Sequence, residues 1–313
     1  MSAVWLFPGQ GSQYVGMGGS YLKAYPSVVR RLEQASECLG VDLSQLIAKG
    51  PRNQLMQTDM AQVAIYTLSV AVSELLAARG MSPVAVAGHS LGQFSALVAA
   101  GALNFEAGLA LVVDRGRFMH AQNQQIDGAM LAVTALDCQE IEAELLGIEQ
   151  VWIANYNAPG QIILSGLRSA LQAAQARLAA AGGKLVWLDV AGPYHTALLK
   201  DAARQFSASI QRVDLRQAAA PLLANSDAAV LTRAEDLLAE LHRHMLAPVC
   251  WSHSMQRIAA MNVQFLVEVG PGKVLRGLAL RNVPHIRCLG TDSLRDFEQA
   301  CTVLQEAGSC AFS

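Results

Sequence analysis

Paired cysteines, basic clusters and a large excess of either charge are all missing from this chain. Its six cysteines include no C-x-x-C pair, so neither a zinc site nor a redox motif of that kind is indicated. Lysine and arginine number 23 against 25 aspartates and glutamates, for a formal net charge of -2. This balance, without a basic run, argues against binding to nucleic acid. We expect free thiols and a cytoplasmic location, because disulfides are rare in a reducing cytosol.

Signal and membrane-spanning segments are also lacking. The N-terminus has neither the basic region nor the long apolar core of a signal peptide. The most apolar stretch, around residues 84–103, is interrupted by His89, Ser90, Gln93 and Ser95, so it predicts a buried turn and helix with no membrane partner. A chain of 313 residues that is 52% hydrophobic can bury one large core or two unequal ones.

A Gly-x-Ser-x-Gly turn is the most informative feature that is present. The apolar run 84–87 leads into this turn, in which Gly88 and Gly92 flank Ser90, and a helical pattern follows. Strand, turn and helix in that order are typical of a nucleophile elbow, which exposes the serine hydroxyl above a sheet. The N–H of Leu91, at the start of the helix, can face a developing negative charge. The turn therefore predicts acyl transfer through an ester of Ser90.

The order of expected elements divides the chain in two. Residues 1–124 and 191–313 read as one α/β domain, and residues 125–190 give the order strand-helix-strand-strand-helix-strand, which is ferredoxin-like. The expected strands are 4–7, 84–87, 130–133, 151–154, 161–164, 185–190, 221–225 and 264–269. The expected helices are 26–38, 42–49, 60–79, 91–100, 105–122, 138–146, 169–181 and a tail from about 290 whose polar end frays.

Seven short motifs follow one another along nearly the whole chain. They are Phe7-Pro8-Gly9-Gln10-Gly11-Ser12-Gln13, Gly88-His89-Ser90-Leu91-Gly92, Arg115-Gly116-Arg117-Phe118-Met119, Asn155-Tyr156-Asn157-Ala158-Pro159-Gly160-Gln161, Gly192-Pro193-Tyr194-His195, Pro248-Val249-Cys250-Trp251 and Glu268-Val269-Gly270-Pro271-Gly272. In this order they make the chain resemble the malonyl-CoA:acyl-carrier-protein transacylases, including the stand-alone acyltransferases that serve polyketide synthases. The resemblance implies an α/β-hydrolase-like large domain with an inserted ferredoxin-like small subdomain.

The resemblance also implies which residues carry the reaction. His195 would be the base that takes the proton of Ser90, since a serine hydroxyl alone is a weak nucleophile. The backbone N–H groups of Gln10 and Leu91 would form the oxyanion hole. A backbone carbonyl near the Pro-Val-x-Trp motif would orient His195, and we assign it to Cys250.

Four further residues are expected to bind the acyl group. The planar guanidinium of Arg115 would pair with the free carboxylate of a malonyl group, and Gln62 and His89 would lie beside the substrate. Tyr194, which directly precedes His195, resembles the bulky residue of malonyl-selective members and would exclude a methyl branch. The implied partners are malonyl-CoA and an acyl carrier protein, with no metal or redox cofactor and a monomeric enzyme.

The other histidines carry no such assignment. We expect surface or satisfied core positions for His120, His242, His244, His253 and His285. His242 and His244 lie close together but lack cysteine or carboxylate partners nearby, so no metal site is predicted. Asp189 lies a few positions before His195, but the geometry of a strand end disfavours it as a triad acid.

Other functions and pathways are left open by the sequence. An editing hydrolase of the same fold would be favoured by the loss of Arg115, and an esterase should place an acid between its serine and its histidine. A docking subunit without activity would not need Ser90 and His195. Supply of a polyketide synthase in trans is favoured over fatty-acid synthesis, because residues 192–195 and 93–94 look closer to the polyketide-associated members.

Overall fold

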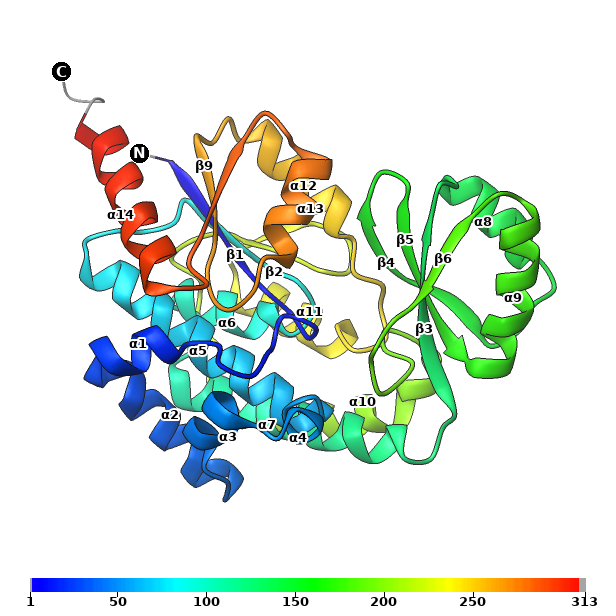
Figure 1. The fold of residues 1–313 in the computed structure, drawn as a ribbon, viewed down its shortest axis with the longest axis horizontal. Coiled ribbons are helices and arrows are strands. Elements are labelled where there is room, and N and C mark those ends of the chain that lie inside the picture. The colour runs from blue at the N-terminus through cyan, green and yellow to red at the C-terminus, as the bar shows by residue number, and fades with distance from the viewer. Residues whose placement is uncertain (1, 310–313) are drawn as a thin grey trace.

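Two β-sheets organise the chain, and the computed structural model describes residues 2–309. The larger sheet has the strand order β10-β9-β1-β2-β7-β8, and the smaller has the order β4-β5-β3-β6. Figure 1 shows the smaller sheet and its two helices, in green, beside the larger domain. The strands are β1 (Ala3–Phe7), β2 (Ala85–Gly88), β3 (Gly128–Thr134), β4 (Val151–Ala158), β5 (Gln161–Leu167), β6 (Lys184–Trp187), β7 (Leu222–Leu223), β8 (Val230–Leu231), β9 (Phe265–Glu268) and β10 (Arg287–Gly290).

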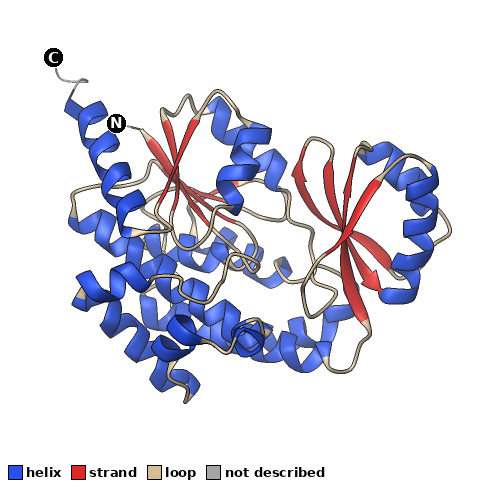
Figure 2. Ribbon diagram, in the orientation of Figure 1, coloured by secondary structure: helices blue, strands red, loops and turns tan. Residues whose placement is uncertain are grey.

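Helices cover the sheets from outside, as the colours of Figure 2 show. They are α1 (Gly19–Ala24), α2 (Pro26–Leu39), α3 (Leu43–Lys49), α4 (Arg52–Leu55), α5 (Thr58–Ala78), α6 (Gly92–Ala99), α7 (Phe105–Asn123), α8 (Cys138–Leu145), α9 (Arg168–Ala180), the 3₁₀ turn η1 (Ala197–Leu199), α10 (Lys200–Ile210), α11 (Ala234–Arg243), α12 (Trp251–Ala260), α13 (Val274–Asn282) and α14 (Leu294–Ser309).

The larger sheet is parallel from β10 to β7, with β8 added antiparallel at the edge, and its strand β1 is buried on both faces. Every residue of β1 is buried, and its side chains alternate between two cores because successive side chains of a strand point to opposite faces. Trp5 and Phe7 belong to the core built with α5, α6 and α7, whereas Val4 and Leu6 belong to the core built with α12 and α13. Continuous apolar strands such as β1 are typical of this architecture.

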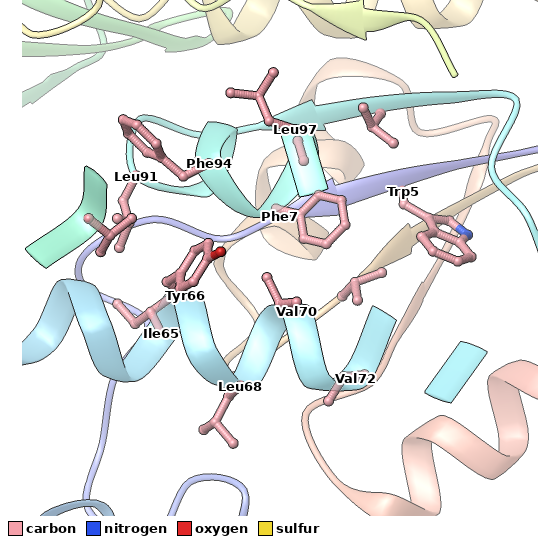
Figure 3. Close-up of a cluster of buried hydrophobic side chains, with 14 of the residues drawn as sticks. Trp5, Phe7, Ile65, Tyr66, Leu68, Val70, Val72, Leu91, Phe94 and Leu97 are labelled. Carbon is pink, nitrogen blue, oxygen red and sulfur yellow. The ribbon is translucent and has the colours of Figure 1, made fainter. Parts of the chain in front are cut away.

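Helix α5 is the central helix of the first core. It is long and apolar enough to cross a membrane, but 83% of its most apolar 18-residue window is buried within the fold. Figure 3 shows Tyr66 and Val70 of this helix in one cluster with Trp5 and Phe7 of β1. A helix that is apolar all round is typical of such a core position.

The smaller sheet forms the predicted ferredoxin-like subdomain. Its elements follow in the order β3-α8-β4-β5-α9-β6, and all three pairs of neighbouring strands are antiparallel. Helices α8 and α9 pack on the sheet around a separate core that includes Leu131, Leu164 and Leu171. All of these elements lie within the stretch 125–190 that the sequence marks as an insert.

The predicted elements of the first two thirds of the chain are all present, but several later ones were not predicted. Helices α10, α11 and α12 and the edge strand β10 are absent from the sequence-based interpretation. Helix α11 buries Leu237, Glu240 and Leu241, an i, i+3, i+4 spacing that fits an amphipathic helix, so its local pattern is helical although the helix was not predicted. The predicted frayed tail and Cys310 lie outside the described residues, and the other five cysteines are free thiols.

Candidate active site

The Gly-x-Ser-x-Gly turn follows the carboxyl end of β2, beside the loop that follows β1. The two strands are parallel, with Phe7 paired to Gly88, so the ends of both strands meet at one edge of the sheet. Ser90 has φ = 50°, in the left-handed region that L residues rarely adopt. A side chain at Gly88 or Gly92 would collide with neighbouring backbone atoms. The close packing of the turn therefore explains both glycines.

Ser90 and His195 form a hydrogen-bonded pair. The Oγ of Ser90 lies 2.8 Å from Nε2 of His195, and Nδ1 of His195 lies 2.9 Å from the carbonyl oxygen of Ala247. Because a carbonyl only accepts, Nδ1 carries the proton and Nε2 is free to accept from the serine. Burial first, and the positive charge of Arg115 second, lower the pKa of His195 to about 3. The imidazole is therefore a neutral base.

The carbonyl that orients His195 is that of Ala247, so the assignment to Cys250 was wrong. The carbonyl of Cys250 instead accepts the N–H of Ser254 at 3.1 Å, in the first turn of α12. Ala247 directly precedes Pro248, outside any helix, so its carbonyl is free to face the imidazole. Cys250 lies close by, with its Sγ 3.1 Å from the carbonyl oxygen of Ser226.

Arg115 points from α7 into the same site. Only 2% of the residue is exposed. One Nη donates to Oε1 of Gln62 at 2.7 Å, and the other lies 3.2 Å from Oγ of Ser90. Burial lowers its pKa to about 10, so the side chain is still a cation at neutral pH. Within residues 2–309 it forms no ion pair, and its Nε has no hydrogen-bond partner. A buried cation of this kind is suited to an anionic ligand.

Gln10 and Leu91 are the two residues expected to form an oxyanion hole; Leu91 directly follows Ser90, and Gln10 lines the same cavity as Ser90. Leu91 precedes the first residue of α6, and Gln10 lies in the loop after β1. Within the described chain neither backbone N–H donates to another protein group. Unpaired donors at this end of the sheet could bind an oxyanion that forms next to Ser90.

His89 and Tyr194 line the cavity but point to different partners. The Nε2 of His89 lies 2.9 Å from Oδ1 of Asn157, which lines the same cavity. The hydroxyl of Tyr194 lies 2.7 Å from Oγ1 of Thr58 and accepts a hydrogen bond from Asn123 at 3.3 Å. These bonds fix the ring of Tyr194 in the wall of the cavity.

The cavity itself lies between the two parts of the molecule. Its volume is about 640 Å³, and it is lined by Ser90, Arg115 and His195 from the larger domain and by Met130 and Ile163 from the smaller sheet. Most of its wall is apolar, which favours a substrate with an uncharged body and few anchoring groups.

Asp189 does not contribute an acid to this site. Its side chain is 82% exposed and pairs with Arg52 at 3.0 Å at the rim of the cavity. Within the described residues no group of three or more His, Cys, Asp or Glu side chains could hold a metal ion.

Four buried polar residues support the site without having been predicted. Asn225 accepts the N–H of Ser90 at 2.7 Å and donates to the carbonyl of Gly88 at 2.8 Å. The side chains of Gln93 and Glu240 hold Asn225 in turn. His244 lies 3.0 Å from the carbonyl oxygen of Ser90. The only sequence signal for Asn225 is its place at the end of a short apolar run, and His244 gave none.

The chain is similar to known acyltransferases over nearly its whole length. Residues 4–283 match the family described as acyl transferase domain. The malonyl CoA-acyl carrier protein transacylase of Bacillus subtilis is 35% identical over 306 residues, which is 96% of each chain. The polyketide biosynthesis protein ThaF of Burkholderia thailandensis is 37% identical over 287 residues, which is 90% of this chain and 24% of that protein.

A solved structure agrees with these matches. A malonyl-transacylase in complex with its type II PKS acyl-carrier protein superposes with a TM-score of 0.93 and 33% identity, covering 96% of this chain and 99% of that one. The sequence and the two-part fold are thus both similar to those of malonyl transacylases. The chain belongs to the acyl transferase domain family, as a member of the malonyl CoA-acyl carrier protein transacylases.

Proposed function

We propose that this chain moves a malonyl group from malonyl-CoA to the phosphopantetheine thiol of an acyl carrier protein, through an ester on Ser90. The observation that carries the proposal is Arg115, a buried guanidinium without an acidic partner in residues 2–309, which lies 3.2 Å from Oγ of Ser90. The free carboxylate of a malonyl group would supply the missing negative charge and fix the thioester carbonyl beside the serine.

The first half-reaction follows from the geometry of the pair. His195 Nε2 takes the proton of Ser90 while Oγ attacks the thioester carbonyl carbon. The N–H groups of Gln10 and Leu91 would stabilise the oxyanion of the tetrahedral intermediate. The C–S bond then breaks, and the leaving thiolate of CoA takes the proton from His195.

The second half-reaction repeats these steps with the carrier thiol. His195 takes the thiol proton, the sulfur attacks the malonyl ester, and the proton returns to Ser90 as the C–O bond breaks. The carbonyl of Ala247 keeps Nδ1 protonated in both steps, so one tautomer serves throughout. The proposed cycle requires no cofactor, and we propose that the enzyme is a monomer.

Intact-protein mass spectrometry with malonyl-CoA tests the proposal. A malonyl adduct that is lost with Ser90→Ala, and that disappears when a phosphopantetheinylated carrier protein is added, supports transfer. Release of free malonate without transfer to the carrier would instead indicate an editing hydrolase. If neither a malonyl adduct nor free malonate forms, the chain is a docking subunit without activity.

The pathway that receives the malonyl group, polyketide or fatty-acid synthesis, is a separate question, because both use the same transfer reaction. Supply of a polyketide synthase in trans is supported by the similarity to ThaF and to the transacylase bound to a type II PKS acyl-carrier protein. Fatty-acid synthesis would use the same reaction. Competition between a polyketide and a fatty-acid carrier protein for the malonyl-enzyme distinguishes them, because the native partner should have the higher kcat/KM.

A further inference from the structure

His244 is a buried histidine at the C-terminal end of α11 that the proposed reaction does not use. It is 1% exposed, and its Nε2 lies 3.0 Å from the backbone carbonyl oxygen of Ser90. Its ring packs edge-to-face on Phe94, with the centroids 5.5 Å apart, and lies 6.1 Å from the ring of His195. It therefore contacts the nucleophile's backbone and the base's ring at once.

The hydrogen bonding of His244 fixes its tautomer. A carbonyl only accepts, so Nε2 carries the proton and Nδ1 is a bare acceptor. Nδ1 has no hydrogen-bond partner within residues 2–309. Burial, with the nearby charge of Arg115, keeps the pKa of His244 well below its ordinary value, so the ring stays neutral. A buried acceptor without a partner is unfavourable, and a leucine at position 244 would have no such acceptor. The N–H donated to Ser90 is the feature that a leucine could not supply.

The carbonyl of Ser90 belongs to a backbone that needs support. Ser90 holds a left-handed φ of 50°, which is costly for a residue other than glycine. Asn225 accepts the N–H of Ser90 at 2.7 Å on one side. His244 and the N–H of Gln93 donate to the carbonyl on the other side, both at 3.0 Å. Both peptide groups of the nucleophile are thus held by side chains from distant parts of the chain.

The end of α11 connects these supports to the base. Glu240 accepts the backbone N–H of Asn225 at 2.8 Å, and its own carbonyl accepts the N–H of His244 at 2.9 Å. Three residues after His244, the carbonyl of Ala247 receives Nδ1–H of His195. One helix end therefore positions the backbone of the nucleophile and the ring of the base.

We propose that His244 is a positioning residue for the acyl transfer, whose Nε2–H fixes the Ser90 peptide so that Oγ meets Nε2 of His195. The inference rests on Ser90 being the nucleophile of the proposed function and does not depend on which acyl group it carries. Glutamine can place an amide N–H in the same direction, whereas leucine and methionine fill the space without a donor.

The test compares His244→Leu and His244→Gln with His242→Leu, a control on the exposed face of the same helix. Single-turnover acylation by malonyl-CoA gives the rate and the substrate dependence of each variant, and thermal unfolding reports folding. A small displacement of a reacting group can cost ~10²-fold, so we expect His244→Leu to lower the rate about 10- to 100-fold without raising KM. His244→Gln should restore most of it, and His242→Leu should match the wild type.

A fluorophosphonate probe makes the test independent of malonyl chemistry. Ser90 Oγ attacks phosphorus, the P–O bond forms, fluoride leaves with the P–F electrons, and His195 takes the serine proton. The labelling rate should follow the same order among the variants. If labelling follows that order while malonyl-CoA gives no adduct, the proposed substrate is wrong and the positioning role stands.

Two results would overturn the inference. The first is a folded His244→Leu protein with wild-type rates in both assays. The second is an equal loss in His244→Leu and His244→Gln, which would mean that the ring only fills space. If His244→Leu does not fold, His244→Met is the donor-free variant to compare, because methionine adapts to irregular gaps.

Discussion

Replacement of Arg115 by methionine removes the guanidinium while filling much of its space. We expect malonyl transfer to fall steeply and acetyl transfer to be almost unchanged, because only the malonyl group has a carboxylate. The two Nη groups of Arg115 now donate to Gln62 and to Ser90. A bound carboxylate would take the place of Ser90 and also engage Nε, which has no partner within residues 2–309.

The magnitude follows from these contacts. Each hydrogen bond to a charged group contributes about 1.5–3 kcal/mol, so two contribute about 3–6 kcal/mol. The bond to Ser90 is given up in exchange, which leaves the lower half of that range. At about 1.4 kcal/mol per tenfold change, we expect kcat/KM for malonyl-CoA to fall ~10²- to 10³-fold.

The assay is single-turnover acylation with malonyl-CoA and acetyl-CoA, followed by mass spectrometry. Arg117→Met is the matched control, since Arg117 lies on the same helix but is exposed and pairs with Asp114. Equal losses for the two thioesters in Arg115→Met would refute the reasoning, because the arginine would then support the fold of the site and not the carboxylate. Unchanged malonyl transfer would refute it too.

Three further predictions concern the surrounding residues. Because the folded pKa of His195 is about 3, below its unfolded value of about 6.5, its contribution to stability is complete above about pH 6.5 and is lost as the pH falls toward 3. Denaturant titrations of wild type and His195→Gln between pH 4 and 7 should show the wild type losing more stability, and a parallel loss in both would contradict this. Tyr194→Phe keeps the ring but removes the hydroxyl that bonds to Thr58 and Asn123, so it should cost about 1–3 kcal/mol of stability and leave the malonyl-to-methylmalonyl ratio unchanged. Tyr194→Ser should lower that ratio ~10- to 200-fold, and an unchanged ratio in competition assays would exclude Tyr194 as the size filter. Asn225→Leu removes both side-chain bonds to the elbow and should cost about 2–5 kcal/mol in chemical denaturation, whereas a cost below about 1 kcal/mol would show that the elbow holds its shape alone.

The sequence was most informative where structure is local. The elbow could be predicted because the sharp turn requires glycines at 88 and 92, two residues before and two residues after Ser90. That requirement holds whatever the rest of the chain does. The order of strands and helices in residues 125–190 likewise follows from short-range periodicity, and it was confirmed. Helices α10 and α11 were not predicted, although the buried residues of each lie at helical spacing.

The supports of the site could not be read from the sequence. Asn225 and His244 contact Ser90 across 135 and 154 residues of chain. The only local sign of either is the short apolar run that ends at Asn225. The error at Cys250 has the same origin. Which carbonyl faces His195 depends on the path of the backbone between α11 and α12. The carbonyl of Cys250 accepts a hydrogen bond within α12, whereas the carbonyl of Ala247 is left free for His195.

The sequence by itself thus determined the kind of chemistry, through a serine held in a turn that only small neighbours permit. The tertiary structure decided the surroundings that the proposed reaction requires of that serine. Burial removes water from Arg115 and His195, so that one is a cation without an acid partner in the described chain and the other a neutral base. Desolvation and hydrogen-bond direction depend on what surrounds a side chain in space, and residues far apart in the chain supply those surroundings.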